Sequence, residues 1–158
     1  MSDKMSSFEL DTWESLHTVV EKLKREVGRD LWANAELSDT EFTVLAHLRL
    51  NPEGVRPGAC AQAIGWDSSR LSHQLRRLEK RGLVQRQADA HDGRAAVLVV
   101  TDVGQEVYRK AIGPHLRSAR KWFAAALSPA QLEGLAEGLN ALQAHIDTLS
   151  NTTSEEKS

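Results

Sequence analysis

The fold is decided by the stretch from Trp66 to Thr101, WDSSRLSHQLRRLEKRGLVQRQADAHDGRAAVLVVT. This stretch predicts an arginine-rich amphipathic helix, followed by two short apolar strands that a polar loop joins. Between Arg70 and Arg94, seven basic residues stand against three acidic ones, whereas the whole chain has a formal net charge of −2. An acidic chain with one basic stretch concentrates positive potential on one surface, which favours a nucleic-acid partner.

The expected helix has one apolar face and one polar, basic face. Leu71, Leu75 and Leu78 recur at helical spacing and form the apolar face. The opposite face carries Ser69, His73, Arg76, Arg77 and Lys80. A single helix fits the major groove of B-DNA, and a β-ribbon beside it reaches the backbone or the minor groove. We therefore predict DNA contact for the basic face. For Arg70 and Arg81, which lie round its side, salt bridges within the chain are an equal alternative.

Working outward, the strands are expected at residues 83–87 and 95–100, around a turn-forming loop at 89–93. The basic helix begins at a cap on Asp67 or Ser68 and ends before Gly82. The other helices are predicted at residues 8–34, 38–50, 57–64, 102–127 and 129–149. The fold class is thus mainly α with a small β-hairpin, that is, α+β.

Capping signals and one internal proline refine these helices. Ser38 with Glu41 forms a capping box at the start of one helix, and Ser128 with Gln131 does so at another. Pro114 is expected to kink the helix at 102–127. The last helix carries a heptad-like apolar seam of Leu132, Leu135, Leu139, Leu142, Ile146 and Leu149. Such a seam needs a partner helix, and we favour a second copy of the chain over ordinary packing within one chain.

The composition is that of an ordinary globular protein, with 158 residues, 27% charged and 41% hydrophobic. No apolar run is long enough to span a bilayer, and the first residues lack the core of a secretory signal. Cys60 is the single cysteine, so no disulfide forms within the chain. We therefore expect a single-domain protein of the cytoplasm without a membrane partner.

The order of elements and several motifs resemble the MarR family of bacterial transcription regulators, over about residues 10–149. The LxxxGLV pattern spans Leu78 to Val84, the DxR pattern is Asp92-Gly93-Arg94, and Thr101 with Gly104 opens the next helix. Val100 replaces the leucine that usually precedes this threonine. The resemblance implies a winged helix-turn-helix at residues 37–101 and a helical dimerisation region at 8–36 and 102–149. Residues 1–7 and 150–158 are expected to be disordered tails.

The resemblance also implies site residues and a mode of DNA binding. A homodimer would read a pseudo-palindromic operator with one recognition helix per subunit in successive major grooves. Base and phosphate contacts fall on Ser68, Ser69, Arg70, His73, Arg76 and Arg77, and Lys80 suits a phosphate. Arg94 falls where a wing arginine enters the minor groove, and Asp92 where a carboxylate braces that arginine.

A small aromatic effector is a further implication of the resemblance. Trp13, His17 and Arg49 are candidates to line its pocket, although tryptophans are more often core or interface anchors. Cys60 does not match the reactive cysteine of peroxide-sensing relatives and is expected to be a buried, inert thiol. The six histidines show no metal-ligand spacing, so neither a metal nor another cofactor is expected. No nucleotide-binding or hydrolase motif indicates an enzyme.

The sequence therefore predicts a homodimeric DNA-binding transcription regulator, a repressor that a small aromatic molecule releases. One alternative is a DNA-architectural or activating protein that senses nothing. Another is a helical adaptor that binds proteins and has a vestigial wing, although such an adaptor should lack a basic face.

Overall fold

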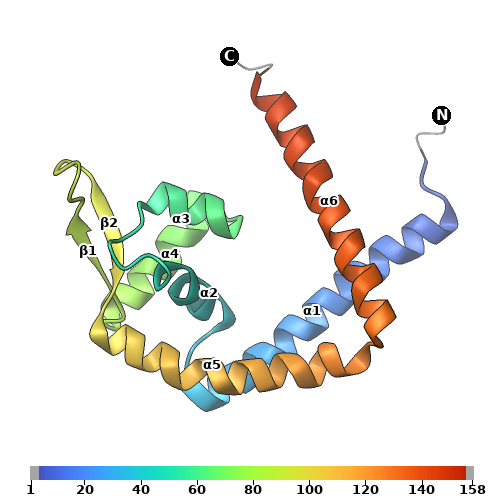
Figure 1. Cartoon of the computed structure of the whole chain (residues 1–158), viewed down its shortest axis with the longest axis horizontal. Coiled ribbons are helices and arrows are strands. Elements are labelled where there is room, and N and C mark those ends of the chain that lie inside the picture. The colour runs from blue at the N-terminus through green and yellow to red at the C-terminus, as the bar shows by residue number, and fades with distance from the viewer. Residues whose placement is uncertain (1–3, 156–158) are drawn as a thin grey trace. The chain divides into compact units, whose positions relative to one another are not determined.

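The computed structural model describes residues 4–155 of the chain (Figure 1). Its elements are α1 (Ser7–Ala35), α2 (Asp39–Leu48), α3 (Pro57–Ile64), α4 (Ser68–Lys80), β1 (Val84–Ala88), β2 (Ala96–Val100), α5 (Asp102–Trp122), the 3₁₀ turn η1 (Ala124–Ala126) and α6 (Pro129–Glu155). The chain divides into two units, Met1–Ala119 and Arg120–Ser158. The predicted fold class, mainly helical with one small hairpin, is confirmed.

Side-chain caps fix where the helices begin. The capping box predicted for Ser38 and Glu41 is present at the start of α2, and Ser6 with Glu9 forms another at α1 that sequence analysis missed. Asp67 caps α4 by accepting a hydrogen bond from the Arg70 amide at 2.8 Å. These caps satisfy amides that the first turn of a helix leaves without a partner.

The core of the first unit forms where α2, α3, α4 and the hairpin meet, as Figure 1 shows. The three leucines predicted for the apolar face of α4 are buried in it. They pack with α2, α3 and the hairpin in one cluster that includes Leu45, Cys60 and Leu98. Full burial of a leucine contributes about 1.5–3 kcal/mol, so this face fixes α4 in place and directs its basic face outward.

The hairpin is antiparallel, with Val84 opposite Val100 and Ala88 opposite Ala96. Its inner strand also pairs with the loop before α3, because Val55 and Leu98 exchange two backbone hydrogen bonds of 3.1 and 2.8 Å. Gly54 has a φ of 99°, and a Cβ there would lie 2.8 Å from the Cβ of Val97. Only glycine fits this close approach, which seats the wing on the helical core.

The Thr101–Gly104 motif joins the hairpin to α5. The Thr101 hydroxyl donates to the Gly82 carbonyl at 2.6 Å and accepts from the Gly104 amide at 3.0 Å. A Cβ on Gly104 would fall 2.1 Å from the Leu83 carbonyl oxygen. The motif therefore fastens the start of α5 to the turn that follows α4.

Several boundaries differ from the sequence prediction. Helix α2 ends at Leu48 rather than residue 50, since the chain turns before the Asn51-Pro52 stop. Helix α5 runs through Pro114 but ends at Trp122, and a 3₁₀ turn takes up the alanines that were expected to continue it. Alanine favours helix without specifying where it ends, which explains the error.

Both predicted tails are shorter than expected in the described residues. Ser6 caps α1 and Ser7 begins it, while residues 1–3 lie outside the described part. Helix α6 continues to Glu155, so residues 150–155 are helical, and residues 156–158 lie outside. No glycine or proline follows Leu149 to stop the helix, and weak helix formers alone do not end one. Within residues 4–155, no helix has the length and apolar character needed to cross a membrane.

Candidate nucleic-acid interface

Helix α4 presents a continuous polar and basic surface. All eight residues predicted to contact DNA are exposed, and seven of them lie on α4: Ser68, Ser69, Arg70, His73, Arg76, Arg77 and Lys80. The Arg76 guanidinium contacts its own helix, donating to the Ser72 carbonyl at 3.3 Å. The helix therefore combines a buried leucine face with an exposed face whose side chains suit phosphates and base edges.

Arg70 has a partner within the chain. Its guanidinium stacks over the ring of Trp66, 4.1 Å from the ring centroid. The sequence left a salt bridge as an alternative for this residue, and the structure places a cation–π contact there instead. Stacking holds the side chain beside the N-terminus of α4 while leaving its N–H groups available.

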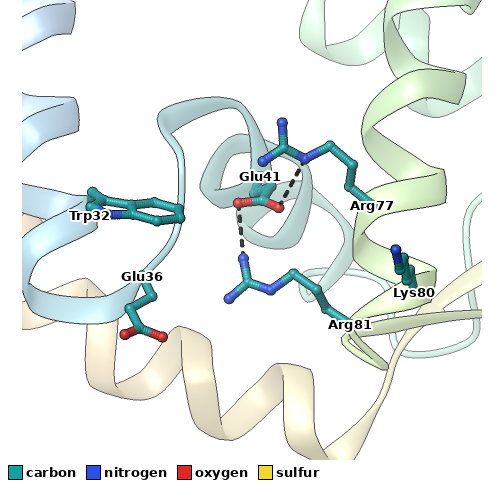
Figure 2. Close-up of a pocket in the computed structure, with 6 residues that line it drawn as sticks. All are labelled: Trp32, Glu36, Glu41, Arg77, Lys80 and Arg81. Atoms are coloured by element: carbon teal, nitrogen blue, oxygen red, sulfur yellow. Dashed lines mark hydrogen bonds and ion pairs between the residues drawn. The ribbon is translucent and has the colours of Figure 1, made fainter.

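Glu41 connects the start of α2 to helix α4 (Figure 2). Its Oε2 accepts hydrogen bonds from the Ser38 amide at 2.9 Å, from the Ser38 hydroxyl at 3.0 Å and from Arg81 at 3.0 Å. Its Oε1 lies 3.7 Å from Arg77 Nε and has no hydrogen bond. One carboxylate thus serves both a helix cap and an ion pair across 40 residues of sequence.

The charge of Glu41 is stabilised although the side chain is fully buried. Burial raises its pKa and is the largest single influence. The hydrogen bonds from Ser38 and the charge of Arg81 together outweigh that influence, so the pKa of Glu41 lies below its ordinary value. The salt bridge left open for Arg81 is therefore present, and Arg77 faces a buried carboxylate as well as solvent.

A cavity of about 430 Å³ opens beside this ion pair. It is lined by Trp32, Glu36, Glu41, Arg77, Lys80 and Arg81, which come from the end of α1, the start of α2 and the C-terminal half of α4. Figure 2 shows the Trp32 ring directed toward Glu41. Sequence analysis missed this cavity because its walls lie far apart along the chain.

The wing loop is held by an arginine that sequence analysis also missed. Arg56 Nε and Nη2 donate to Asp89 Oδ2 at 2.9 and 2.7 Å, and Nη2 lies 3.5 Å from Asp92. Asp89 in turn accepts from the His91 amide at 2.9 Å. That hydrogen bond, followed by the one from Arg56, lowers the pKa of Asp89. Arg56 therefore ties the loop between the strands to the start of α3.

Asp92 holds the backbone next to Arg94. Its Oδ1 accepts from the Arg94 amide at 3.2 Å. Asp92 thus holds the Arg94 backbone, while its bracing of the Arg94 side chain stays a prediction. The other Asp92 oxygen faces Arg56. The Arg94 side chain is exposed in the loop between the strands and has no ion pair within residues 4–155. By contrast, Arg86 on β1 pairs with Glu79 at 2.9 Å.

The residues predicted to line an effector pocket lie on α1 and at the end of α2. Trp13 and His17 contact each other edge to face on α1, with ring centroids 4.2 Å apart. Arg49 stands over the ring of Tyr108 at 4.6 Å, in a stack that continues through Phe42 to His115. No contact joins Arg49 to Trp13 or His17 in the described residues.

Cys60 is buried, and His115 is partly buried. Burial raises the pKa of the Cys60 thiol to about 11, and the expectation of a buried thiol is confirmed. Burial also lowers the pKa of His115, against the opposing charge of Asp39, and His115 Nδ1 has no hydrogen bond. In the described part of the chain, no group of three or more His, Cys, Asp or Glu residues is placed to hold a metal ion.

Two helices carry apolar residues that this chain leaves exposed. In the second unit, the six seam residues of α6 have exposed fractions of 37–55%. In the first unit, α1 exposes Phe8, Leu10, Trp13, Leu16, Val19 and Val20. Contiguous apolar surfaces of this kind are rare on monomers and indicate an interface.

Comparison with known proteins shows which family the chain resembles. A family model described as MarR family matches residues 35–95. The chain is similar to AbsC, a MarR family transcriptional regulator of Streptomyces coelicolor, with 28% identity, a TM-score of 0.82 and coverage of 93% of this chain and 99% of that one. It is similar to Sco3205 of the same organism, solved in complex with DNA, with 27% identity, a TM-score of 0.83 and coverage of 90% and 94%.

A third solved structure shares the fold. CouR from Rhodococcus jostii RHA1, bound to p-coumaroyl-CoA, has 22% identity, a TM-score of 0.74 and coverage of 89% of this chain and 95% of that one. The family match covers α2 to the wing, where the basic helix and the Arg94 loop lie. The chain is therefore similar to MarR family transcriptional regulators, by the family model from α2 to the wing and by the structures of AbsC and Sco3205 over 90% or more of its length.

Proposed function

We propose that this protein is a homodimeric repressor of the cytoplasm that binds a pseudo-palindromic operator and is released by a small aromatic effector. The observation that carries the proposal is the exposed basic face of α4, which three buried leucines anchor. Beside it lies a wing whose Arg94 is exposed and has no ion pair in the described residues. Such a helix suits the major groove, and an arginine at a wing tip suits the minor groove.

The proposed roles differ along the interface. Arg76, Arg77 and His73 face the position of the bases, while Ser68, Ser69 and Lys80 suit phosphates. Arg70 contacts the DNA from its place on the Trp66 ring. Arg94 enters the minor groove, and Asp92 braces its backbone. The similar protein Sco3205 was solved in complex with DNA, which supports DNA as the partner of this chain.

The exposed apolar surfaces of α1 and α6 support the proposed dimer. Helices in residues 8–36 and 102–149 would pack against the same regions of a second copy, burying the seam from Leu132 to Leu149. A dimer presents two recognition helices about 34–36 Å apart, one turn of DNA, and so reads two half-sites together. A ligand that alters this spacing shifts the population toward states that do not bind.

The support for a small aromatic effector comes mainly from a protein of similar structure. CouR binds p-coumaroyl-CoA, an aromatic thioester. In this chain Trp13 and His17 already contact each other, and a pocket that includes Arg49 would have to be completed by the second copy.

The test is DNA binding by the full chain to fragments that flank its own coding region. We expect the log of the affinity to fall by about 0.9 per neutralised phosphate for each tenfold rise in salt. Arg94→Ala and Arg76→Ala should each weaken binding by about 1–3 kcal/mol while the protein stays folded. Arg109→Ala, on α5, is the control and should bind as the unaltered protein does. Retained affinity in both interface variants, or a flat salt profile, would refute the proposed DNA face.

A further inference from the structure

Arg70, at the side of the basic face of α4, is held in a different way from the arginines around it. Its guanidinium stacks over the Trp66 ring, 4.1 Å from the centroid, and its side chain has no ion pair or hydrogen bond within residues 4–155. We propose that Trp66 is a positioning residue, which holds Arg70 for contact with a DNA phosphate and keeps its charge from being neutralised within the chain. This inference rests on the proposed function, in which α4 binds DNA.

The Trp66 ring is a fixed support. Its side chain is half-buried and packs against the hydrophobic core of the first unit. Its amide donates to the Ala61 carbonyl at 2.9 Å, which fixes the backbone between α3 and α4. An indole held in this way presents its electron-rich face to a cation without further ordering.

The backbone of Arg70 is fixed as well. Its amide donates to Asp67 Oδ1 at 2.8 Å, in the first turn of α4. The side chain is therefore held at its base by the helix cap and at its end by the indole ring. A free arginine loses much rotamer freedom when it binds a ligand, whereas a stacked guanidinium has already lost part of it. The stack thus lowers the entropic cost of a DNA contact.

Asp67 is the nearest competitor in sequence for the charge of Arg70, because side chains three residues apart in a helix are neighbours. In the part of the chain that the structure describes, these two side chains form no ion pair, and the guanidinium lies on Trp66 instead. Other arginines of this surface do face carboxylates. Arg81 pairs with Glu41 and Arg86 pairs with Glu79. Arg70 therefore keeps its charge for an anion from outside the chain.

The position of Arg70 on the helix favours a phosphate over a base edge. Successive residues are about 100° apart around a helix, so Arg70 lies well round from Ser69, which shares the centre of the basic face with His73 and Lys80. The centre of a helix in the major groove faces the base edges, and its sides face the two DNA backbones. The stack covers one face of the guanidinium and leaves its N–H edge for the paired contact that arginine makes with phosphate.

The first experiment needs no DNA. In the unaltered protein, the ring current of Trp66 should shift the NMR signal of the Arg70 Nε proton upfield, with Arg70→Gln as the means of assignment. The signal should return to the ordinary arginine position in Trp66→Leu and should stay upfield in Trp66→Phe. An unshifted signal in the unaltered protein would overturn the positioning role without any need for a variant that folds.

The second experiment tests the phosphate contact. DNA binding is measured with a duplex that flanks the coding region and with a scrambled duplex of the same length. Arg70→Gln should weaken binding to both by about ten-fold, and should reduce the dependence of log affinity on log salt by about 0.9 per subunit. A loss confined to the first duplex would show a base contact and overturn the assignment to phosphate.

A double-mutant cycle then separates positioning from a merely structural role. Trp66→Leu should weaken DNA binding by about five-fold, and Trp66→Phe should stay within about two-fold of the unaltered protein. Added to Arg70→Gln, Trp66→Leu should change the affinity by less than about two-fold, because Trp66 acts through Arg70. Circular dichroism verifies that the helices are intact. Equal losses in the two backgrounds would show that Trp66 acts through the fold and would overturn the proposal.

Failure of the proposed function gives a different result from failure of this inference. A chain that binds neither duplex refutes the proposed function and the phosphate contact together. A chain that binds DNA but shows no coupling between Trp66 and Arg70 refutes the positioning role alone.

Discussion

At the scale of single residues, Glu41 shows how one side chain serves two parts of the fold. Its capping role was predicted from the sequence, because Ser38 and Glu41 lie three residues apart and the motif is local. Its pair with Arg81 was not predicted, since 40 residues separate the partners and their meeting depends on how α2 packs against α4. Local chemistry is therefore predictable here, whereas a buried charge partner follows only from tertiary packing.

Replacing this carboxylate should destabilise the protein. We expect Glu41→Gln to lower the free energy of unfolding by about 2 kcal/mol, because charged hydrogen bonds to Ser38 and Arg81 are lost. The lowered pKa of Glu41 means that this stabilisation is present above its ordinary value of 4.5 and is lost as the pH falls through the lower folded value. Chemical denaturation at fixed protein concentration measures both effects.

The control for Glu41→Gln is a substitution of Glu36, a second carboxylate that lines the same cavity. Glu36→Gln removes an exposed carboxylate and should change stability by less than about 0.5 kcal/mol. Equal stability of Glu41→Gln and the unaltered protein at neutral pH would show that the buried pair contributes nothing to folding.

His115 adds a second pH dependence. Burial against Phe42 lowers its pKa, with Asp39 as the opposing charge, so the folded state favours the neutral ring. The unfolded chain then binds more protons below the ordinary pKa of 6.5, and stability should fall as the pH decreases from 7 toward 5. His115→Phe should reduce this slope. Parallel curves for the two proteins, together with an unshifted His115 titration by NMR, would contradict the prediction.

At the scale of elements, the wing illustrates which contacts a local pattern cannot reveal. The strands, their connecting loop and the position of Arg94 were predicted to within one residue or two from alternation and turn residues. Arg56, which holds the wing loop through Asp89, lies 33 residues earlier in the sequence, just before α3. Position 54 likewise needs a glycine, because the side chain of Val97 lies too close to leave room for a Cβ there. The shape of the wing is thus encoded locally, but its attachment is not.

Loss of this anchor should loosen the loop. In Arg56→Ala, the amides of His91 and Arg94 should exchange hydrogen about five-fold faster, because a partly exposed ion pair contributes about 1 kcal/mol at most. Hydrogen exchange followed by NMR measures both amides directly. Arg86→Ala, which removes the pair with Glu79 on β1, is the matched control and should leave these two amides unaffected. Unchanged exchange in Arg56→Ala would show that the loop holds itself.

At the scale of the whole molecule, the sequence predicted the element order, but the ends of α5 and α6 and the cavity at Glu41 needed the structure. The spacing of the α6 seam specified a helix face, and its exposure in the single chain agrees with a surface that lacks a partner. Exposure of the six apolar residues of this seam to water is unfavourable in free energy. Burial against a second copy would remove this cost.

This seam makes the dimer testable by a change of charge. Leu139→Glu combined with Leu142→Glu places two carboxylates in the seam, and burial of such charges would cost several kcal/mol. We expect sedimentation to show a dimer for the unaltered protein and a monomer for the double variant at micromolar concentration. Ala144→Glu, on the opposite face of α6, adds a charge without touching the seam and should remain dimeric. Because two half-sites are read together, the double variant should also lose most of its DNA affinity. A dimeric double variant would place the interface elsewhere and would leave the exposed seam of α6 without its proposed partner.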